Sequence, residues 1–438
     1  MNPSWQRVSA ACTALFLLCG CAPGEPTGAM DAEMNEIAEA YVRVVLAVGL
    51  HDPDYVDAYY GPPEWREEVN ADTLALTEIA GRAQPLIDRL RALDLAAAQE
   101  IVLLRREYLA RQLESLVSRV GLLQGTSMSF DEESRALYDA VAPAHPESHF
   151  DSLLARLEPL LPGSGPVATR YEQWRQAFII PKERLDTVFK AAIAEARART
   201  VSHIELPQAE SFTLEYVTGK TWSGYNWYQG EVRSLIQINT DFPITIDRAI
   251  DLAAHEGYPG HHVYNVLLES ALVRERGWVE FSVYPLFSPQ SLIAEGSANF
   301  GIDVAFPGEE RVTFERDVLY PLAGLDPARV DEYARVMRLV DALSYAGNDA
   351  ARRYLDGQID AEAAASWLHR YALYSLDRAR QRVGFIEQYR SYVINYNLGQ
   401  DLVRAWVESR GGTDDDPARR WEVFAQLLSS PRLPSGLR

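Results

Sequence analysis

His255-Glu256-Gly257-Tyr258-Pro259-Gly260-His261-His262 carries three of the eight histidines of this 438-residue chain. The segment before it, 246–254, has apolar residues at helical spacing, and 234–240 before that is rich in β-branched residues. The sequence therefore predicts a strand followed by a helix that carries His-Glu. Zinc peptidases present their metal in this way, with the histidine on the ion and the glutamate facing a water molecule. We expect His255 to be a zinc ligand and Glu256 to be a general base.

The second ligand has to come from an unusual spacing. The fourth residue after His255 is Pro259, and the next histidines follow at the sixth and seventh positions. On a straight helix these would lie about 9–10 Å further along the axis. Two nitrogens that each bind one zinc at about 2.1 Å are at most about 4 Å apart. We expect the helix to break at the proline and glycines and to fold His261 back. His262 needs more compression, so it is a candidate to support a ligand. The alternative is a helix end with exposed histidines nearby.

A third ligand is offered by Glu295, which lies among apolar residues in the segment 292–300. A carboxylate on such a helix needs a partner, and a metal ion held with two histidines is one. A salt bridge in the core is the alternative. Asn299 and Asp251 each lie one turn from a proposed ligand and could accept the N–H of a ligating imidazole. Both could equally be polar residues of a helix surface.

Most of the chain around these residues is patterned as helix. Apolar residues recur at three- and four-residue spacing from 30 to about 203 and again after 245. Between these regions lie three segments rich in β-branched and aromatic residues: 212–217, 221–228 and 232–239. We expect a mostly α fold with one small antiparallel sheet beside the metal-binding helix. The predicted division is an N-terminal helical region, 31–205, and a catalytic region, 206–438.

The composition excludes several classes of function. Asp and Glu number 62 against 42 Lys and Arg, a net charge of −20, which disfavours nucleic-acid binding and would favour basic or amine-bearing substrates. The three cysteines all lie within the first 21 residues, so the body has no disulfide, no cysteine zinc site and no thiol nucleophile. The sequence contains no Gly-x-Ser-x-Gly elbow and no glycine-rich phosphate loop.

The N-terminus is typical of a bacterial lipoprotein signal. Residues 1–21 contain Arg7, a short apolar run and Leu18-Cys19-Gly20-Cys21, which resembles a lipobox with Cys21 as the lipidated residue. An ordinary secretory signal with incidental cysteines is the alternative. Residues 22–30 suggest a flexible tether, and no other apolar run is long enough to span a bilayer. We expect a lipid-anchored protein of the cell envelope, outside the cytoplasm. Ala22 is compatible with the outer membrane of a Gram-negative cell.

The octapeptide, together with Ala294-Glu-Gly-Ser-Ala298, resembles the bacterial family catalogued as domain of unknown function 885. A third block, Tyr396-Asn-Leu-Gly399, is also similar to this family, and the likeness is strongest from about 230 to 399. The family is grouped with the gluzincin metallopeptidases and often occurs as lipoproteins. One departure is Ser297, where the family more often has tryptophan, and this leaves the substrate open.

The resemblance implies a largely helical peptidase fold with zinc as cofactor. It implies His255, His261 and Glu295 as ligands and Glu256 as the base. The family also has tyrosine at the position after the second histidine, which again favours His261 over its neighbour.

On this interpretation, zinc acidifies a water molecule, and Glu256 takes its proton and passes it to the leaving amine. Tyr396 is the candidate donor to the oxyanion, followed by Tyr392, Tyr345 and His369. The strand at 234–240 would hold an extended peptide by edge pairing.

Two other functions remain open from the sequence. One is a lipoprotein that binds metal or peptide without catalysis, against which the presence of Glu256 argues. The other is a zinc hydrolase of non-peptide amides or esters, since the same activated water would serve. The sequence does not indicate an oligomeric state.

Overall fold

The computed structural model describes residues 27–96 and 98–438. The predicted signal peptide (1–21), its lipidation site Cys21 and the tether up to residue 26 lie outside the described residues. The first helix begins at Thr27, so residues 27–30, predicted as tether, are helical. The main helices are α1 (Thr27–Gly49), α2 (Pro63–Ala71), α3 (Leu76–Ala92), α4 (Glu100–Leu123), α5 (Phe130–Tyr138), α6 (Glu147–Leu157), α7 (Val167–Arg175), α8 (Leu185–Val201), α9 (Asp247–Leu252), α10 (His261–Leu268), α11 (Pro289–Ala305), α12 (Gly308–Phe314), α13 (Tyr320–Ala323), α14 (Val330–Asp341), α15 (Ala346–Leu355), α16 (Ala361–Tyr371), α17 (Leu376–Tyr389), α18 (Ile394–Glu408) and α19 (Pro417–Leu428). The mostly α prediction is confirmed.

The three predicted strands form one sheet, but its pairing differs from the prediction. The strands are β2 (Ser211–Val217), β3 (Gly224–Gly230) and β4 (Arg233–Asn239), in the order β2-β4-β3. β3 and β4 pair antiparallel, whereas β2 and β4 pair parallel, so the sheet is mixed and not antiparallel. β4 is the central strand, with both of its edges already hydrogen-bonded. The expectation that the strand at 234–240 binds a peptide by its edge was therefore wrong, and β3 is the edge strand beside the site.

A second sheet was not predicted. β1 (Val56–Tyr59) pairs antiparallel with β5 (Val283–Pro285), whose three residues are all buried. These strands have four and three residues, too few for an alternating pattern to stand out in the sequence. Their pairing joins the N-terminal helices to the second half of the chain.

The two predicted regions share one large hydrophobic cluster, whose buried members lie between Met34 and Leu437, and a small second cluster lies under the sheet at Phe189, Ile236, Ile238 and Leu252. A buried ion pair also connects the two regions: Arg105 on α4 donates to Glu280 at 2.6 Å, and the exposed fractions of these side chains are 1% and 0%. Among the described helices, none is both apolar and long enough to cross a membrane.

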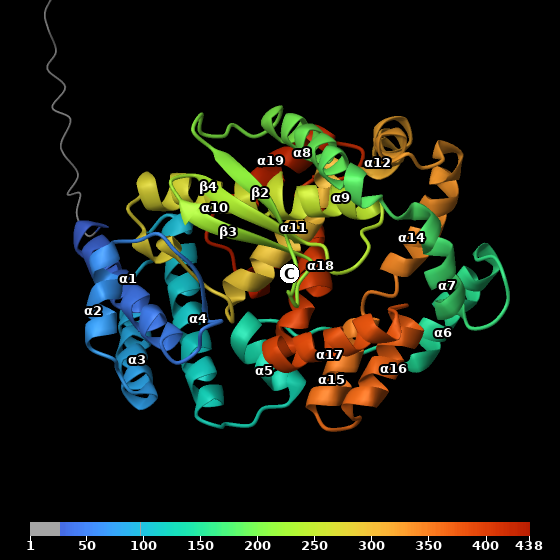
Figure 1. Cartoon of the computed structure of the whole chain (residues 1–438). Helices are drawn as coiled ribbons and strands as arrows, with labels where there is room; N and C mark the ends of the chain where they lie inside the picture. The colour runs from blue at the N-terminus through green and yellow to red at the C-terminus, as the bar shows by residue number, and fades with distance from the viewer. Residues whose placement is uncertain (1–26, 97) are drawn as a thin grey trace, which may run out of the picture.

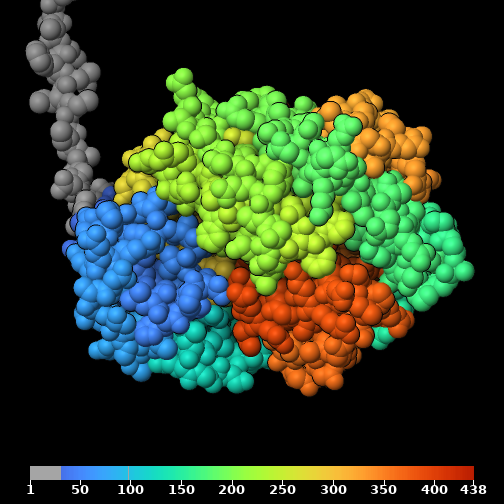
Figure 2. All heavy atoms as spheres, viewed as in Figure 1, coloured from blue at the N-terminus to red at the C-terminus, as the bar shows by residue number. Residues whose placement is uncertain are grey.

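The helices α11 and α18 cross near the middle of the molecule (Figure 1). They touch through glycines: a Cβ placed on Gly296 would lie 2.3 Å from the carbonyl carbon of Gly399. The Ala-Glu-Gly-Ser-Ala and Tyr-Asn-Leu-Gly blocks of the sequence therefore meet at this crossing. In Figure 1 the sheet and α8 lie above it, and α15, α16 and α17 lie below. Figure 2 shows the yellow-green surface of the sheet region facing the orange-red surface of α17 across a seam.

Candidate metal centre

The helix that carries the first histidine ends in a sharp bend. α9 widens into a π-helical turn, Ala253–Gly257, in which Tyr258 N donates to Ala253 O at 3.1 Å. A cis peptide bond joins Tyr258 to Pro259, and α10 begins at His261. Gly260 lies in the bend, and a Cβ there would be 1.9 Å from the carbonyl oxygen of His255, so only glycine fits. The expected break in the helix is present, and it returns the chain to His255.

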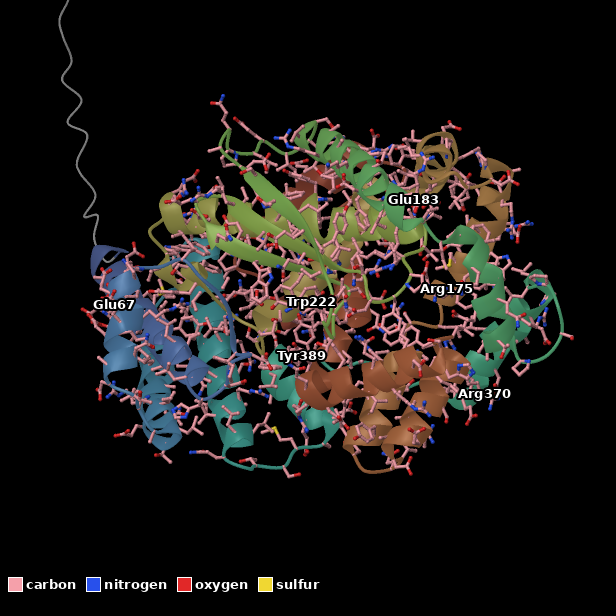
Figure 3. All side chains as sticks on the ribbon, in the orientation of Figure 1. Glu67, Arg175, Glu183, Trp222, Arg370 and Tyr389 are labelled. Atoms are coloured by element: carbon pink, nitrogen blue, oxygen red, sulfur yellow. The ribbon has the colours of Figure 1, made fainter. Side chains whose placement is uncertain are left out.

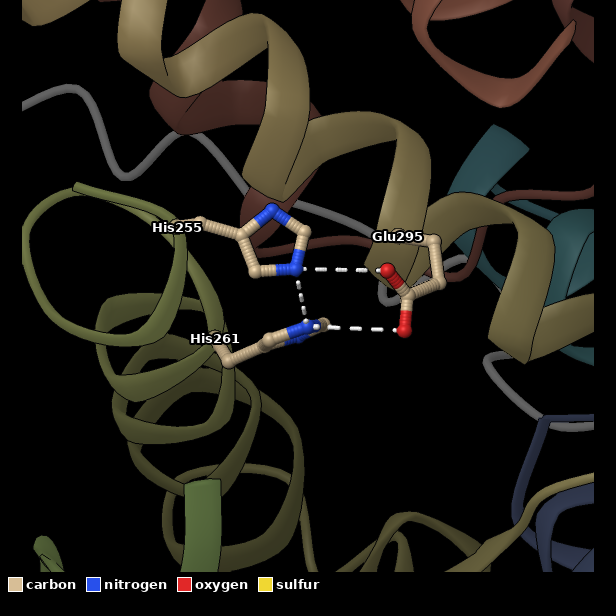
Figure 4. Close-up of side chains that lie close together, drawn as sticks. All are labelled: His255, His261 and Glu295. Atoms are coloured by element: carbon tan, nitrogen blue, oxygen red, sulfur yellow. Dashed lines mark hydrogen bonds and ion pairs between the residues drawn. The ribbon is translucent and has the colours of Figure 1, made fainter. Parts of the chain in front are cut away.

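Three side chains converge beyond the bend (Figure 4). The Nε2 atoms of His255 and His261 are 3.1 Å apart. The carboxylate of Glu295, from α11, lies 3.3 Å from His255 Nε2 and 3.7 Å from His261 Nε2. Two donors that each lie about 2.1 Å from a tetrahedral zinc ion are separated by about 3.4 Å. The three observed separations bracket this value, so the residues fit a zinc ion without rearrangement.

Two supporting hydrogen bonds orient these donors. His255 Nδ1 lies 2.9 Å from Asn299 Oδ1, and Asn299 Nδ2 donates to the carbonyl of Tyr396 at 2.9 Å. Since the amide nitrogen is used by Tyr396, its oxygen must accept from Nδ1–H, which leaves the lone pair of His255 on Nε2, facing the centre. Tyr392 donates to Glu295 Oε1 at 2.7 Å.

The other carboxylate oxygen of Glu295, Oε2, is buried and lies 3.3 Å from His255 Nε2; with the lone pair of His255 on that nitrogen, Oε2 receives no hydrogen bond from the described residues. A buried carboxylate oxygen without a donor is costly, and a metal ion would satisfy it.

The surroundings of the two histidines shift their pKa values in opposite directions. Burial, opposed in part by Glu295, lowers the pKa of His261 to about 4, so this imidazole is neutral at pH 7. Burial also lowers the pKa of His255, but the hydrogen bond to Glu295 and the charge of Glu256 outweigh it and raise that pKa above 6.5. Burial raises the pKa of Glu295, but the two histidines and Tyr392 lower it below 4.5 overall, so it is ionised at neutral pH.

The predicted base, Glu256, lies beside this centre. Its exposed fraction is 4%, and its carboxylate receives no hydrogen bond or ion pair from any residue that the structure describes. Its Oε1 rests against Gly224 on β3, where a Cβ would approach it to 2.7 Å. Burial raises the pKa of Glu256 to about 7, with the charge of His255 opposing the rise and that of Glu295 adding to it. A carboxylate with this pKa can accept and return a proton near neutral pH.

The site opens into a cavity of about 540 Å³ between the sheet region and α17. Figure 3 labels three of its lining residues: Arg175 on α7, Trp222 before β3 and Tyr389 at the end of α17. Tyr396 also lines it, and burial and the charge of Glu295 raise the pKa of that phenol well above 10, so its hydroxyl stays protonated. Tyr396 therefore has a proton to donate, and its role as the oxyanion donor stays a prediction.

Two residues of the cavity lining, Asp57 and Tyr225, were not predicted from the sequence. Asp57 on β1 accepts a hydrogen bond from Tyr225 on β3, and both face the cavity. Burial raises the pKa of Asp57 to about 7, although the Tyr225 hydroxyl opposes the rise. Nothing in the short β1 segment marks this aspartate in the sequence, because its place depends on the β1–β5 pairing.

Two residues predicted to support the ligands lie elsewhere. His262 is fully buried, and its ring nitrogens contact Ser234 Oγ at 2.8 Å and Glu210 Oε2 at 3.0 Å, on the side of the sheet. Asp251 does not reach His255. It pairs with Arg311 at 2.8 Å and Arg248 at 3.2 Å. The π-helical turn that begins at Ala253 alters the helical register, so residues four apart no longer stack there.

Two lower-ranked donors are also outside the cavity lining. Tyr345 donates to Asp401 at 2.6 Å, and His369 contacts the carbonyl of Tyr374 at 2.6 Å.

Comparisons with known proteins identify a shared fold. No family model matches the chain, and no curated protein matches it, so membership of the domain of unknown function 885 family or of the gluzincins stays a prediction. A crystal structure described as that of a "putative lipoprotein" from Colwellia psychrerythraea is similar, with a TM-score of 0.51 and 15% identity. The match covers 85% of this chain and 71% of the Colwellia chain.

Proposed function

We propose that this protein is a zinc metallohydrolase that cleaves peptide bonds. The observation that supports it is one juxtaposition: two imidazoles and a carboxylate with separations of 3.1–3.7 Å, and the unpaired carboxylate of Glu256 in the same cavity. A protein that only stored or bound a metal would have no use for a buried carboxylate left without a partner.

In the proposed reaction, His255, His261 and Glu295 would hold the ion. When bound, zinc supplies Lewis acidity, which polarises a carbonyl group and acidifies water. Glu256 takes a proton from the attacking water as the water oxygen bonds to the carbonyl carbon. The same carboxylate returns that proton to the amine nitrogen as the C–N bond breaks. Tyr396 donates its hydroxyl proton in a hydrogen bond to the developing oxyanion.

The substrate backbone is proposed to lie along β3. Gly224 and Tyr225 line the cavity, and β3 pairs with β4 on one side only within the described sheet. An extended peptide could therefore add to this edge by main-chain hydrogen bonds.

The test begins with bound metal per chain, measured by mass spectrometry on the soluble body. We expect one zinc in the parent and none in His261→Ala or Glu295→Ala, with His51→Ala, an exposed histidine outside the site, as the control that keeps it. Glu256→Gln should keep zinc but lose hydrolysis of a peptide library by at least about 100-fold. A parent that takes up no zinc would refute the proposal, and a zinc-loaded parent that cleaves esters or non-peptide amides alone would redirect it.

We also propose that the protein is lipid-anchored in the cell envelope through Cys21, outside the cytoplasm. The lipobox-like segment supports this, as does the similar protein described as a "putative lipoprotein". Cys21→Ser should move the protein from the membrane fraction to the soluble fraction and abolish labelling by a radioactive fatty acid. Labelling that persists in Cys21→Ser would contradict the proposed attachment site.

A further inference from the structure

The cavity carries a concentration of positive charge that the proposed chemistry does not use. Four arginines line it: Arg175 from α7, Arg248 from α9, and Arg378 and Arg382 from α17. We call these four residues the arginine wall. Their charges converge on Tyr374: burial alone would raise the pKa of this phenol, but the four guanidinium groups lower it below its usual value of 10. Four positively charged side chains around one cavity are unexpected in a chain of net charge −20 and suggest a role for them.

Two of these arginines have no carboxylate partner within the described chain. Arg378 packs against the ring of Tyr374, with Cζ 5.0 Å from its centroid. Arg382 packs against Phe385 at 4.2 Å and Tyr396 at 5.6 Å. Both guanidinium groups are therefore held in place by aromatic rings and keep their N–H donors available. The next residue of this type on α17, Arg380, faces outward and pairs with Glu362.

The acids on this side of the cavity do not neutralise the wall. Asp251 is shared between Arg248 and Arg311. Asp341 also lines the cavity, but burial and the charge of Asp251 raise its pKa to about 7, so part of it is uncharged at neutral pH. Six acids line the cavity as a whole, including Asp57, Asp247, Glu256 and Glu295, but none of them forms an ion pair with Arg378 or Arg382 within the described chain.

One residue, Tyr396, contacts both the arginine wall and the hydrogen-bond network of the candidate metal centre. Arg382 lies over the ring of Tyr396, and the carbonyl of Tyr396 accepts the hydrogen bond from Asn299 that orients His255. A substrate bound at both places would fill the cavity between them.

We infer that the arginine wall binds a carboxylate of the peptide substrate while the bond to be cleaved lies at the metal centre. A planar carboxylate can accept two parallel hydrogen bonds from a guanidinium group, and a peptide offers one at its C-terminus or on an Asp or Glu side chain. The inference rests on the proposed function for the reaction, but the binding itself does not require zinc. It reverses the expectation of basic substrates, which followed from net charge alone.

The first test compares matched substrates with the zinc-loaded full chain. One peptide is supplied with a free C-terminus and as its amide, and an internal glutamate is changed to glutamine in a second pair. We expect loss of the recognised carboxylate to lower kcat/KM about 10–100-fold, mostly through KM, and the pair that responds identifies which carboxylate is read. If neither pair responds, the inference is overturned.

The second test assigns the effect to residues. Arg378→Met and Arg382→Met keep the apolar stems packed on their rings, and thermal melting checks that they fold. Each should lower kcat/KM for the carboxylate-bearing substrate much more than for its uncharged partner, so that the preference for the carboxylate is lost. Arg380→Met, on the outer face of the same helix, should behave like the parent. Equal losses on charged and uncharged substrates would show a structural role and contradict the inference.

The third test separates this inference from the proposed function. Titration calorimetry on metal-free protein uses acetyl-alanyl-alanine, acetyl-glutamine amide and acetyl-glutamate amide as probes. We expect a carboxylate probe to bind at least 10-fold more tightly than the neutral probe, and Arg378→Met to abolish the difference. If the carboxylate probe binds more tightly but the protein hydrolyses no peptide, the proposed hydrolase function is refuted and the arginine wall stands as a binding site. If the protein hydrolyses peptides but the probes bind equally, the proposed function stands and the inference about the arginine wall is refuted.

Discussion

The carboxamide of Asn299 joins the metal centre to helix α18. Its oxygen holds His255 Nδ1 and its nitrogen holds the carbonyl of Tyr396, both at 2.9 Å. Since both ends of the amide are used, neither the amide nor the imidazole can turn without breaking a hydrogen bond. The sequence placed Asn299 and Asp251 as equal candidates for this position, and only the structure separates them.

We predict that Asn299→Ala weakens zinc binding about 10–100-fold, because His255 loses the acceptor that fixes its tautomer and orientation. Competition with a calibrated chelator measures the change. Asn299→Asp retains an acceptor oxygen and should bind zinc at least as well as Asn299→Ala does. An unchanged affinity in Asn299→Ala would show that the surrounding packing alone orients the imidazole.

A second buried network lies on the other side of the octapeptide, around Glu210. Burial alone would raise the pKa of this carboxyl. Hydrogen bonds from His262, Tyr258 and Arg197 outweigh burial and lower that pKa to about 2. Because the folded-state pKa lies below the ordinary 4.5, ionised Glu210 stabilises the fold fully above that value. This contribution is lost as the pH falls through about 2.

We predict that Glu210→Gln lowers the free energy of unfolding by about 1–3 kcal/mol at pH 7, where it removes charge-assisted hydrogen bonds. The difference from the parent should shrink as the pH falls from 5 toward 2, because the parent then loses the same charge. Thermal melting at pH 7, 4 and 3 follows it. Glu205→Gln, at an exposed site nearby, should melt like the parent at each pH. A difference that does not vary with pH would contradict the assignment to ionisation.

At the scale of elements, the crossing of α11 and α18 sets the position of Glu295 and Tyr396. The crossing is close because Gly296 and Gly399 meet with no side chain between them. A methyl group there would have to push the two backbones apart, and both functional residues are within three positions of the contact.

We predict that Gly296→Ala destabilises the protein by at least about 1–3 kcal/mol, the usual cost of overpacking a tight core. Its thermal midpoint is the measurement. Gly81→Ala in the middle of α3 is the matched control: a Cβ there meets no atom within 4 Å, so it should raise the midpoint slightly. If Gly296→Ala melts like Gly81→Ala, the helices must be free to separate.

The elements show where prediction from sequence succeeds and where it stops. The positions of β2, β3 and β4 follow from local composition, but which strands become neighbours depends on contacts across the molecule. β4 is the last of these three strands in the chain and lies between the other two, which no local pattern encodes. The break at Gly260 was predictable because it follows from ligand spacing, a local constraint.

At the scale of the whole molecule, the predicted division at residue 205 does not separate two cores. Glu280 is buried against Arg105, and β5 pairs with β1, so the second half contains a charge and a strand whose partners lie in the first. Leaving a buried charge without its partner costs several kcal/mol.

We predict that residues 206–438 alone do not fold cooperatively. The isolated fragment should bind a hydrophobic dye, lack near-ultraviolet circular dichroism and melt without a sharp transition, unlike residues 27–438. Adding the fragment 27–205 should restore part of the signal by complementation. A sharp melting transition in the fragment alone would establish it as an independent domain.

The residues of the candidate site that are close together in the sequence could be predicted, whereas those that only the fold brings together could not. His255 and His261 share one octapeptide, and Glu295 is the lone acid of the apolar segment 292–300, so each stands out in the sequence. Members of the arginine wall come from three helices, and each alone is an ordinary surface-like arginine. Only the fold brings them to one cavity, so the cavity leads to a different proposal for the substrate than net charge does.

The hydrogen bonds of Asn299 connect His255 of the metal centre to Tyr396, which lines the cavity. The carbonyl of Tyr396 accepts the hydrogen bond from the amide that holds His255. A ligand that displaced Tyr396 would therefore alter the hydrogen bonds that orient this imidazole. A spectroscopically active ion in place of zinc would report, through its colour, a molecule that never touches it.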